Sequence, residues 1–268
     1  RVKAMQVLFA KNRDKDLTLP ATLKLYWSSI EQTYELFLLN LYVLTEVARV
    51  SLEDEQARKS KIRPKDADRQ FQAKLFHNKI ITHLAGNKAL NIKYEKLGFT
   101  DNVDTDIVQK IYSHFAKEES YINYWSKETS LEEDIEMLLE LYRFCRASEI
   151  FNELMTDEYF LWSSEKSIVI GSVKKVLKNK QLETDFFDEF YPDQPTTKDF
   201  GEDLLIKTDE QEKELNEMII PKLKNWDKDR VTILDMILIK MSIVEFLSFE
   251  TIPTKVTMNE YVELSKNY

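Results

Sequence analysis

The side chains that could act as catalytic groups or metal ligands are few, and their spacing suits neither task. The three histidines, His77, His83 and His114, form no H-E-x-x-H or E-x-x-H pair, so they predict no helical zinc or di-iron site. No G-x-G-x-x-G, P-loop or G-x-S-x-G pattern occurs, and four scattered glycines cannot build a loop that cradles a phosphate. We therefore expect a protein that is not an enzyme, with no metal and no cofactor.

Two further motifs resemble reactive sites but favour a structural role. The segment D-N-V-D-T-D at 101–106 lacks the glycine at position six and the glutamate at position twelve of a calcium loop, and is interpreted as the cap of a helix that starts near Asp106. Cys145 lies on an apolar helix face, which favours inert core; the flanking Arg143 and Arg146 leave a thiol of lowered pKa as the alternative. One cysteine allows no internal disulfide, so we expect a reducing, cytoplasmic location.

Charge is spread unevenly along the chain. The whole chain has a net charge of −9. Residues 181–215 hold twelve acids and three lysines, so this segment alone has the same net charge as the whole chain. Residues 58–74 hold seven basic residues against Asp66 and Asp68. Residues 1–13 contain no acid and four cations, namely Arg1, Lys3, Lys11 and Arg13. Such local patches bind phosphates even when a distant segment is acidic, because charges are screened beyond roughly 10 Å; the alternative interpretation is a solvated charge run.

Composition and apolar spacing both favour an all-α protein. Glycines and prolines are too few for architectures built on tight turns, and apolar residues recur at steps of three and four. No apolar run has membrane length. Ser130 and Glu133 have the spacing of a capping box, and the acidic segment 182–201 is the best linker candidate. The predicted helices span 1–12, 21–58, 69–85, 88–97, 105–124, 131–155, 157–179, 202–224, 230–248 and 257–268.

The stretch from Trp226 to Tyr268 has the most regular pattern in the chain. From Val231 to Leu247 apolar residues cover most of a helical circumference, which is typical of a helix in the middle of a bundle. Pro253 marks a turn after this helix, because the residue before a proline is disfavoured in helical conformation. Thr257 and Glu260 then have capping-box spacing, which predicts a second helix that starts there.

Both ends of the chain carry patterns found together in one protein family. The segment I-P-T-K-V-T-M-N-E-Y-V-E-L-S-K at 252–266 is similar to I-P-x-K-V-x-I-N-E-x-V-E-L-A-K, and it follows a hydrophobic helix, as in that family. The segment R-V-K-A-M-Q-V-L-F at 1–9 is similar to R-x-x-A-x-Q-x-L-Y, the end of an arginine-rich motif. On these motifs the chain resembles the NusB family of bacterial transcription antitermination factors, over roughly 1–11 and 198–268.

The resemblance also implies a division of the chain. Residues 14–195 have no counterpart in the compact form of the family and look like the long helical insertion of some members. We expect an N-terminal helix of the NusB-like core at 1–13, a helical insertion region at 14–195, and a C-terminal NusB-like helical bundle at 196–268. The family's final helix, with F-V-N-G-V-L-D, and most of its arginine cluster are absent from this sequence.

The function that the resemblance implies is RNA binding in transcription antitermination. NusB-like proteins pair with the small-subunit ribosomal protein NusE, hold boxA-type single-stranded RNA, chiefly of ribosomal RNA transcripts, and join the RNA polymerase antitermination complex. Carried over by position, Arg1 and Lys3 would contact RNA, and Phe9 and Asp235 would contact the protein partner. Core packing is the alternative role for Phe9.

Two other functions stay open. The first is a helical protein-interaction scaffold whose insertion recruits a different partner. The second is the NusB-like domain that is attached to RNA cytosine methyltransferases, which is disfavoured because the chain has no glycine-rich cofactor loop and no catalytic cysteine pair.

Overall fold

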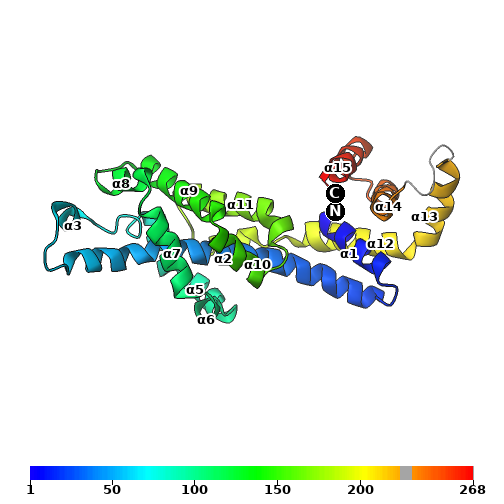
Figure 1. Ribbon diagram of the computed structural model, residues 1–268. Helices are drawn as coiled ribbons and strands as arrows, with labels where there is room; N and C mark the ends of the chain where they lie inside the picture. Colours follow the sequence, from blue (N-terminus) through cyan, green and yellow to red (C-terminus); the bar gives the residue numbers. More distant parts are fainter. Residues whose placement is uncertain (224–230, 268) are drawn as a thin grey trace. The chain divides into compact units, whose positions relative to one another are not determined.

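The structure, a computed structural model, describes residues 1–223 and 231–267 of the chain. Helices and no strands occur in these two ranges, so the prediction of an all-α protein is confirmed (Figure 1). Trp226 and Tyr268, the ends of the regular C-terminal stretch, lie outside the described residues.

The chain folds into two compact units. Unit 1 consists of Arg1–Glu31 and Pro192–Tyr268, and unit 2 consists of Gln32–Tyr191. The long helix α2 (Leu19–Lys59) supplies residues to both units. The chain passes back from unit 2 to unit 1 between Tyr191 and Pro192, inside the predicted linker 182–201. That segment is nevertheless folded: it contains η1 (Phe186–Phe190) and most of η2 (Pro195–Glu202), and Phe186 and Phe187 are buried. Aromatic side chains drive this burial despite the acidic composition.

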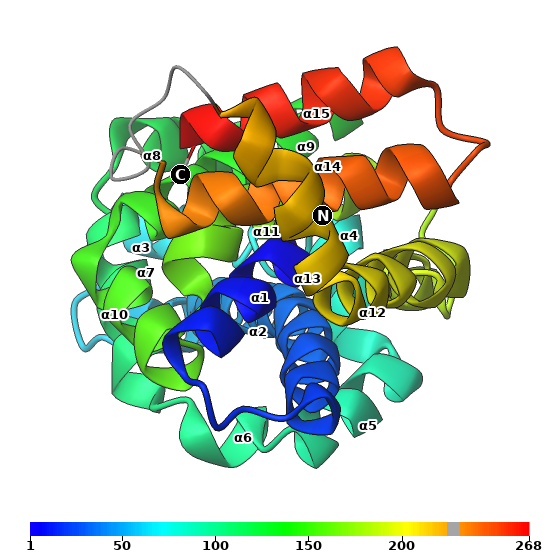
Figure 2. The ribbon, with the colours of Figure 1, turned by 90° about the vertical axis from the view of Figure 1, so that its right-hand side faces the viewer.

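Unit 1 is a helical bundle in which α14 packs against α1, α12, α13 and α15, as Figure 2 shows for several of these pairs. Its core is made of aliphatic and aromatic side chains from both ends of the chain: Ala4, Met5, Val7, Leu8, Tyr26, Ile30, Leu204, Leu205, Leu215, Ile219, Ile237, Leu238, Met241, Val244 and Tyr261. Besides the start of α2 and η2, its elements are α1 (Val2–Arg13), α12 (Asp203–Glu210), α13 (Glu212–Ile219), η3 (Ile220–Lys222), α14 (Ile233–Ser248) and α15 (Thr254–Asn267). The predicted central helix is thus confirmed as α14.

Unit 2 is built on the remainder of α2, whose buried apolar residues join a second, larger core. Cys145 is fully buried in this core, so its predicted core position is confirmed, and burial raises the pKa of its thiol to about 12. Its other elements are α3 (Asp66–Gln70), α4 (Lys79–Gly86), α5 (Lys88–Lys96), α6 (Phe99–Asn102), α7 (Thr105–Phe115), α8 (Glu119–Trp125), α9 (Leu131–Ala147), α10 (Glu149–Glu158), α11 (Trp162–Lys178) and η1.

Local capping explains several helix boundaries. Ser130 and Glu133 form the predicted capping box of α9, and Asp104 caps α7 by accepting a hydrogen bond from the Asp106 amide. The helix predicted at 131–155 is wrong as one element, because it ends at Ala147 and a new helix starts at Glu149. The helix predicted at 69–85 likewise splits into α3 and α4.

Candidate functional site

A buried carboxylate joins the N-terminal helix to the C-terminal pair of helices in unit 1. Glu245, on α14, is only 1% exposed. Arg1 donates to both of its oxygens, from Nε at 2.9 Å and from Nη2 at 2.7 Å. Thr257 Oγ1 donates to Oε1 at 2.8 Å, and Tyr261 Oη donates to Oε2 at 3.2 Å. The Arg1 guanidinium also lies 4.9 Å from the ring centroid of Phe200 in η2. This cluster, which we name the Glu245 cluster, ties four elements together.

The Glu245 cluster satisfies a charge that would otherwise be costly to bury. Burial alone would raise the pKa of Glu245, but hydrogen bonds from Arg1 and Thr257, with the Arg1 charge, hold it below its ordinary value. Burial and the adjacent Glu245 carboxylate raise the pKa of Tyr261, so its hydroxyl stays a neutral donor. The sequence patterns assign no role to Glu245; its position in a mostly apolar helix is the signal that could have found it.

The prediction that Thr257 and Glu260 start a helix is wrong. Helix α15 begins at Thr254, one turn earlier, directly after Pro253. Thr257 is fully buried, and its hydroxyl is used by Glu245 on another helix. A threonine followed three residues later by a glutamate satisfies a sequence pattern here without forming the local motif.

Of the two predicted RNA-contacting residues, Arg1 has structural partners already. Besides Glu245, its Nη1 lies 3.5 Å from Glu260 Oε2, and 20% of its side chain is exposed. Lys3, in the first turn of α1, is half-buried. RNA contact by Arg1 and Lys3 stays a prediction.

The two predicted partner-contacting residues lie on α1 and α14, which pack against each other. Phe9 is half-buried against the core of unit 1, with the Arg13 guanidinium 5.7 Å from its ring centroid. Asp235 forms a capping box at the start of α14: Oδ2 accepts from the Thr232 amide at 3.0 Å, and Thr232 Oγ1 accepts from the Asp235 amide at 3.1 Å. Asp235 therefore has a local structural role, and partner contact by Phe9 and Asp235 stays a prediction.

An apolar groove begins beside Asp235 and runs between α14 and α15. The groove encloses about 410 Å³, and its walls include Leu238, Phe246, Met258 and Val262. Met258 and Val262 are 57% and 53% exposed. Exposed apolar side chains gathered along one groove are typical of a surface that contacts another chain segment or protein.

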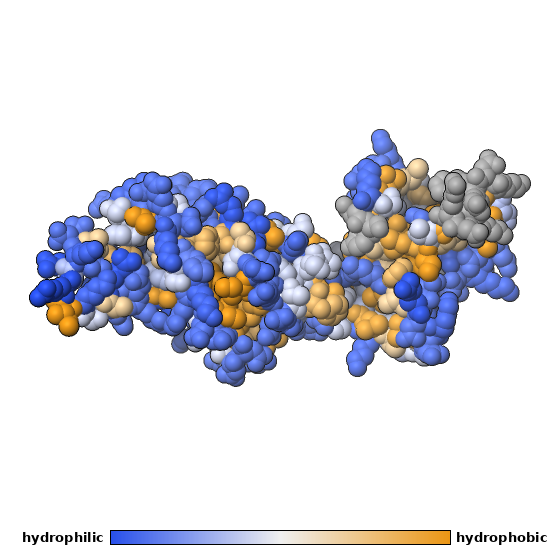
Figure 3. All heavy atoms as spheres, viewed as in Figure 1, coloured by the Kyte–Doolittle hydropathy of each residue, from blue (hydrophilic) through white to orange (hydrophobic). Residues whose placement is uncertain are grey.

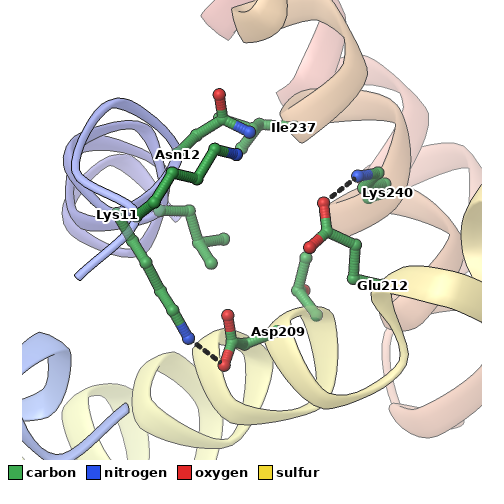
Figure 4. Close-up of a pocket in the computed structure, with 9 residues that line it drawn as sticks. Lys11, Asn12, Asp209, Glu212, Ile237 and Lys240 are labelled. Carbon is green, nitrogen blue, oxygen red and sulfur yellow. Dashed lines mark hydrogen bonds and ion pairs between the residues drawn. The ribbon is translucent and has the colours of Figure 1, made fainter. Parts of the chain in front are cut away.

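A polar pocket of about 230 Å³ lies on another part of unit 1, where α1, α12, α13 and α14 meet (Figure 4). Figure 4 shows Lys11 and Asp209 paired across it, and Lys240 pointing to Glu212. Lys240 is buried, and its Nζ lies 2.7 Å from Glu212 Oε1. The hydrogen bond from Lys240, assisted by the charges of Lys240, Lys15 and Lys11, lowers the pKa of Glu212 despite burial. Two ion pairs in this pocket therefore link the helices around it. One of them, between Lys11 and Asp209, joins the basic N-terminus to the acidic segment 181–215.

Sites of two other classes do not occur in the described part of the chain. Within residues 1–223 and 231–267, no three His, Cys, Asp or Glu side chains are grouped so that they could hold a metal ion. None of the helices in these ranges combines the length and the apolar character needed to cross a membrane.

Comparison with known proteins identifies the family. The model of the NusB family matches residues 166–268. Among curated relatives, the transcription antitermination protein NusB of Salinibacter ruber is 36% identical over 74 residues, which cover 28% of this chain and 46% of that protein. The NusB protein of Exiguobacterium sp. (strain AT1b) is 36% identical over 88 residues, 33% of this chain and 69% of that protein. The Bacillus subtilis protein is 36% identical over 76 residues, 28% of this chain and 58% of that protein.

Each match therefore covers only part of this chain and only part of the relative. The chain spans about half the length of most of these relatives, and no solved structure gives a significant match. The matched segment contains α14 and α15, which carry Glu245, Thr257 and Tyr261 of the Glu245 cluster and the C-terminal motif quoted above. The resemblance is confirmed: this chain belongs to the NusB family.

Proposed function

We propose that this protein is an RNA-binding transcription antitermination factor, without enzymatic activity. It acts with the small-subunit ribosomal protein NusE on boxA-type nascent RNA, chiefly ribosomal RNA transcripts, within the RNA polymerase antitermination complex. Family membership supports this proposal, because the curated relatives are named transcription antitermination proteins.

The observation that carries the proposal is the Arg1–Glu245 pair. It joins the segment at 1–9 to the helices α14 and α15, so both family motifs belong to one bundle rather than to separate parts of the chain. A shared bundle supports a shared binding surface, because a rigid scaffold holds its contact residues in fixed positions.

RNA contact is assigned to the start of α1, through Lys3 and the remaining N–H groups of Arg1. Phosphates attract such cations without regard to base sequence. Protein contact is assigned to Phe9 and Asp235. In the capping box the hydrogen bonds of Asp235 go to Oδ2, and Oδ1 accepts none from residues 1–223 and 231–267, so we assign Oδ1 as the acceptor for a partner.

A binding assay tests the proposal. The full chain and its cognate ribosomal protein are titrated onto boxA-type RNA and onto a scrambled RNA of the same composition at moderate salt. We expect a preference for boxA-type RNA, and equal affinity for the two RNAs would contradict it. Lys3→Ala should weaken binding, whereas Lys166→Ala, an exposed lysine of α11, is the matched control.

A second function, a protein-interaction scaffold, is favoured by exposed apolar residues of unit 2. Phe160 and Ile168 are 73% and 62% exposed. If unit 2 recruits a protein, Phe160→Ser with Ile168→Ser should impair antitermination in a reconstituted transcription assay while RNA affinity stays at the wild-type value. Wild-type antitermination by this variant would argue against the scaffold role of these two residues.

A further inference from the structure

The loop between α2 and α3, together with α3 itself, carries a group of cations that have no ion pair within residues 1–223 and 231–267. Four of the seven basic residues in 58–74 have partners. Arg58 pairs with Asp54 at 2.8 Å, Lys59 pairs with Glu55, Lys61 pairs with Asp68 at 2.7 Å, and Lys74 donates to backbone oxygens of Tyr124 and Lys127. The other three, Arg63, Lys65 and Arg69, are exposed, and the described residues offer them no ion pair. Asp66 is the one exposed acid among them, so this group keeps a net positive charge.

The base of this loop is held rigidly. The Arg58 guanidinium lies 4.1 Å from the ring centroid of Phe71 and 5.9 Å from that of Trp125. On the returning chain, the Ala73 amide donates to Glu55 Oε2 at 2.8 Å. Interactions of this kind restrain the loop in the absence of a ligand, and a restrained loop loses less conformational entropy on binding.

Asp68, in α3, ties that helix to the loop before it. It accepts a hydrogen bond from the Lys65 amide at 2.9 Å and one from Lys61 Nζ at 2.7 Å. Pro64 fixes one backbone dihedral between Arg63 and Lys65. The cations are therefore presented on a defined backbone.

An apolar side chain stands among these cations. Ile62 is 99% exposed, and Figure 3 shows hydrophobic atoms beside strongly hydrophilic ones at the end of unit 2 that carries α3. One such side chain is too little for a membrane anchor, since even a single fatty-acyl chain binds membranes only marginally. A single apolar side chain of this size can pack against a base, as isoleucine does when it is inserted between base steps in other nucleic-acid complexes.

We propose that residues 61–69, which we name the α3 tip, form a second RNA-contact surface. Arg63, Lys65 and Arg69 bind phosphates of single-stranded RNA without sequence preference, and Ile62 packs against a base. This inference rests on the proposed function, because it requires that the chain binds RNA, but it concerns a different surface and a different part of the affinity.

The test compares two triple variants of the full chain. Arg63→Ala/Lys65→Ala/Arg69→Ala removes the three cations of the α3 tip, and Lys174→Ala/Lys175→Ala/Lys178→Ala removes three exposed lysines of α11 in the same unit. Affinity for long boxA-type and scrambled single-stranded RNAs is measured by fluorescence anisotropy as a function of salt. Urea unfolding of each variant verifies that it is folded.

We expect the tip variant to bind both RNAs more weakly and the α11 variant to bind them nearly as the wild type does. Each phosphate contact to single-stranded RNA contributes roughly 0.7 to the slope of log affinity against log salt concentration. Because three contacts are lost, the fold-loss of affinity relative to the wild type should be roughly a hundredfold larger at about 0.1 M salt than at about 1 M. Ile62→Ser should weaken binding at all salt concentrations without changing the slope.

Wild-type affinity and slope in the tip variant would overturn the inference, as would an equal loss in the α11 variant. Unchanged affinity in Ile62→Ser would overturn the contact to a base. A tip variant that loses binding to vesicles of anionic lipid, and keeps its affinity for RNA, would assign the surface to membranes instead. Failure of the proposed function looks different: the wild type with its ribosomal protein would bind boxA-type and scrambled RNA equally, whatever the tip contributes to both.

Discussion

Arg1 and Glu245 form a two-point ion pair, with Nε and Nη2 of the arginine 2.9 Å and 2.7 Å from the two carboxylate oxygens. The carboxylate is buried, and 20% of the arginine side chain is exposed. Because Thr257 and Tyr261 donate to the same carboxylate, a single buried anion organises α1, α14 and α15. In this chain the arginine predicted for RNA contact is therefore also a structural residue.

Removing the Glu245 carboxylate should destabilise unit 1 strongly. Glu245→Ala leaves the Arg1 charge and two hydroxyl donors without their acceptor. We expect a loss of about 3 kcal/mol in the free energy of unfolding. This value is at the lower end of the range for a broken buried pair, because Arg1 keeps some contact with water. Urea unfolding monitored by circular dichroism measures the change in the free energy of unfolding.

Glu260→Ala is the matched control for this prediction. Glu260 also faces Arg1, at 3.5 Å, but 53% of its side chain is exposed. An exposed pair of this kind contributes about 0–1 kcal/mol. Equal destabilisation by Glu245→Ala and Glu260→Ala would show that the cluster does not depend on the buried anion.

The same carboxylate predicts a pH dependence. The pKa of Glu245 is lower in the folded protein than its ordinary value of 4.5, so the unfolded chain binds more protons as the pH falls. The stabilisation from Glu245 is therefore present above about pH 4.5 and is lost as the pH falls through the lower folded pKa. Glu245→Gln isolates this contribution: the difference in unfolding free energy between wild type and variant should shrink on acidification. A difference that is constant from neutral to acid pH would contradict the prediction.

Cys145 should be unreactive in the folded protein. Burial raises the pKa of its thiol to about 12, so almost no thiolate exists near neutral pH, and the reactive form is the thiolate. Reaction with a chromogenic disulfide reagent should proceed at the rate of unfolding and become fast in urea. Rapid modification in buffer, at the rate of a free thiol, would argue that the core around Cys145 opens in the native state.

Local signals in the sequence predicted the fold well, and long-range contacts explain what they missed. The capping box of Ser130 and Glu133 depends on neighbours three residues apart, so the sequence reveals it directly. Thr257 has the same local pattern, but its hydroxyl is bound by Glu245, which no local rule detects. The pair of Lys11 and Asp209 joins residues 198 positions apart, and only the fold brings them together.

The candidate site divides in the same way. The family motifs are sufficient to locate α1, α14 and α15, because each motif consists of residues that are contiguous in sequence. The roles of Arg1 and Asp235 within the bundle depend on side-chain partners, and hydrophobic periodicity does not specify those partners. For Asp235 the local capping pattern with Thr232 is present in the sequence and explains its position at the start of α14.

Alanine substitutions at two glycines should have effects of opposite sign. A Cβ atom at Gly201, in η2, would collide with the hydroxyl of Tyr26, which donates a 2.8 Å hydrogen bond to the Thr197 carbonyl oxygen. Gly201→Ala should therefore destabilise the protein by about 1–3 kcal/mol, as overpacking does in other cores. Gly171, in the interior of α11, has open space around its Cβ position, so Gly171→Ala should stabilise it by about 0.5–1 kcal/mol through helix propensity.

A double variant separates the collision at Gly201 from other causes. Tyr26→Phe removes the hydroxyl that the new Cβ atom would meet, at the cost of one buried hydrogen bond. If the collision causes the defect, Gly201→Ala should be less destabilising in the Tyr26→Phe background than in the wild type, and thermal or urea unfolding of the four proteins gives the coupling free energy. Strict additivity of the two substitutions would instead place the need for glycine in the backbone of η2, because the loss would then be independent of the tyrosine hydroxyl.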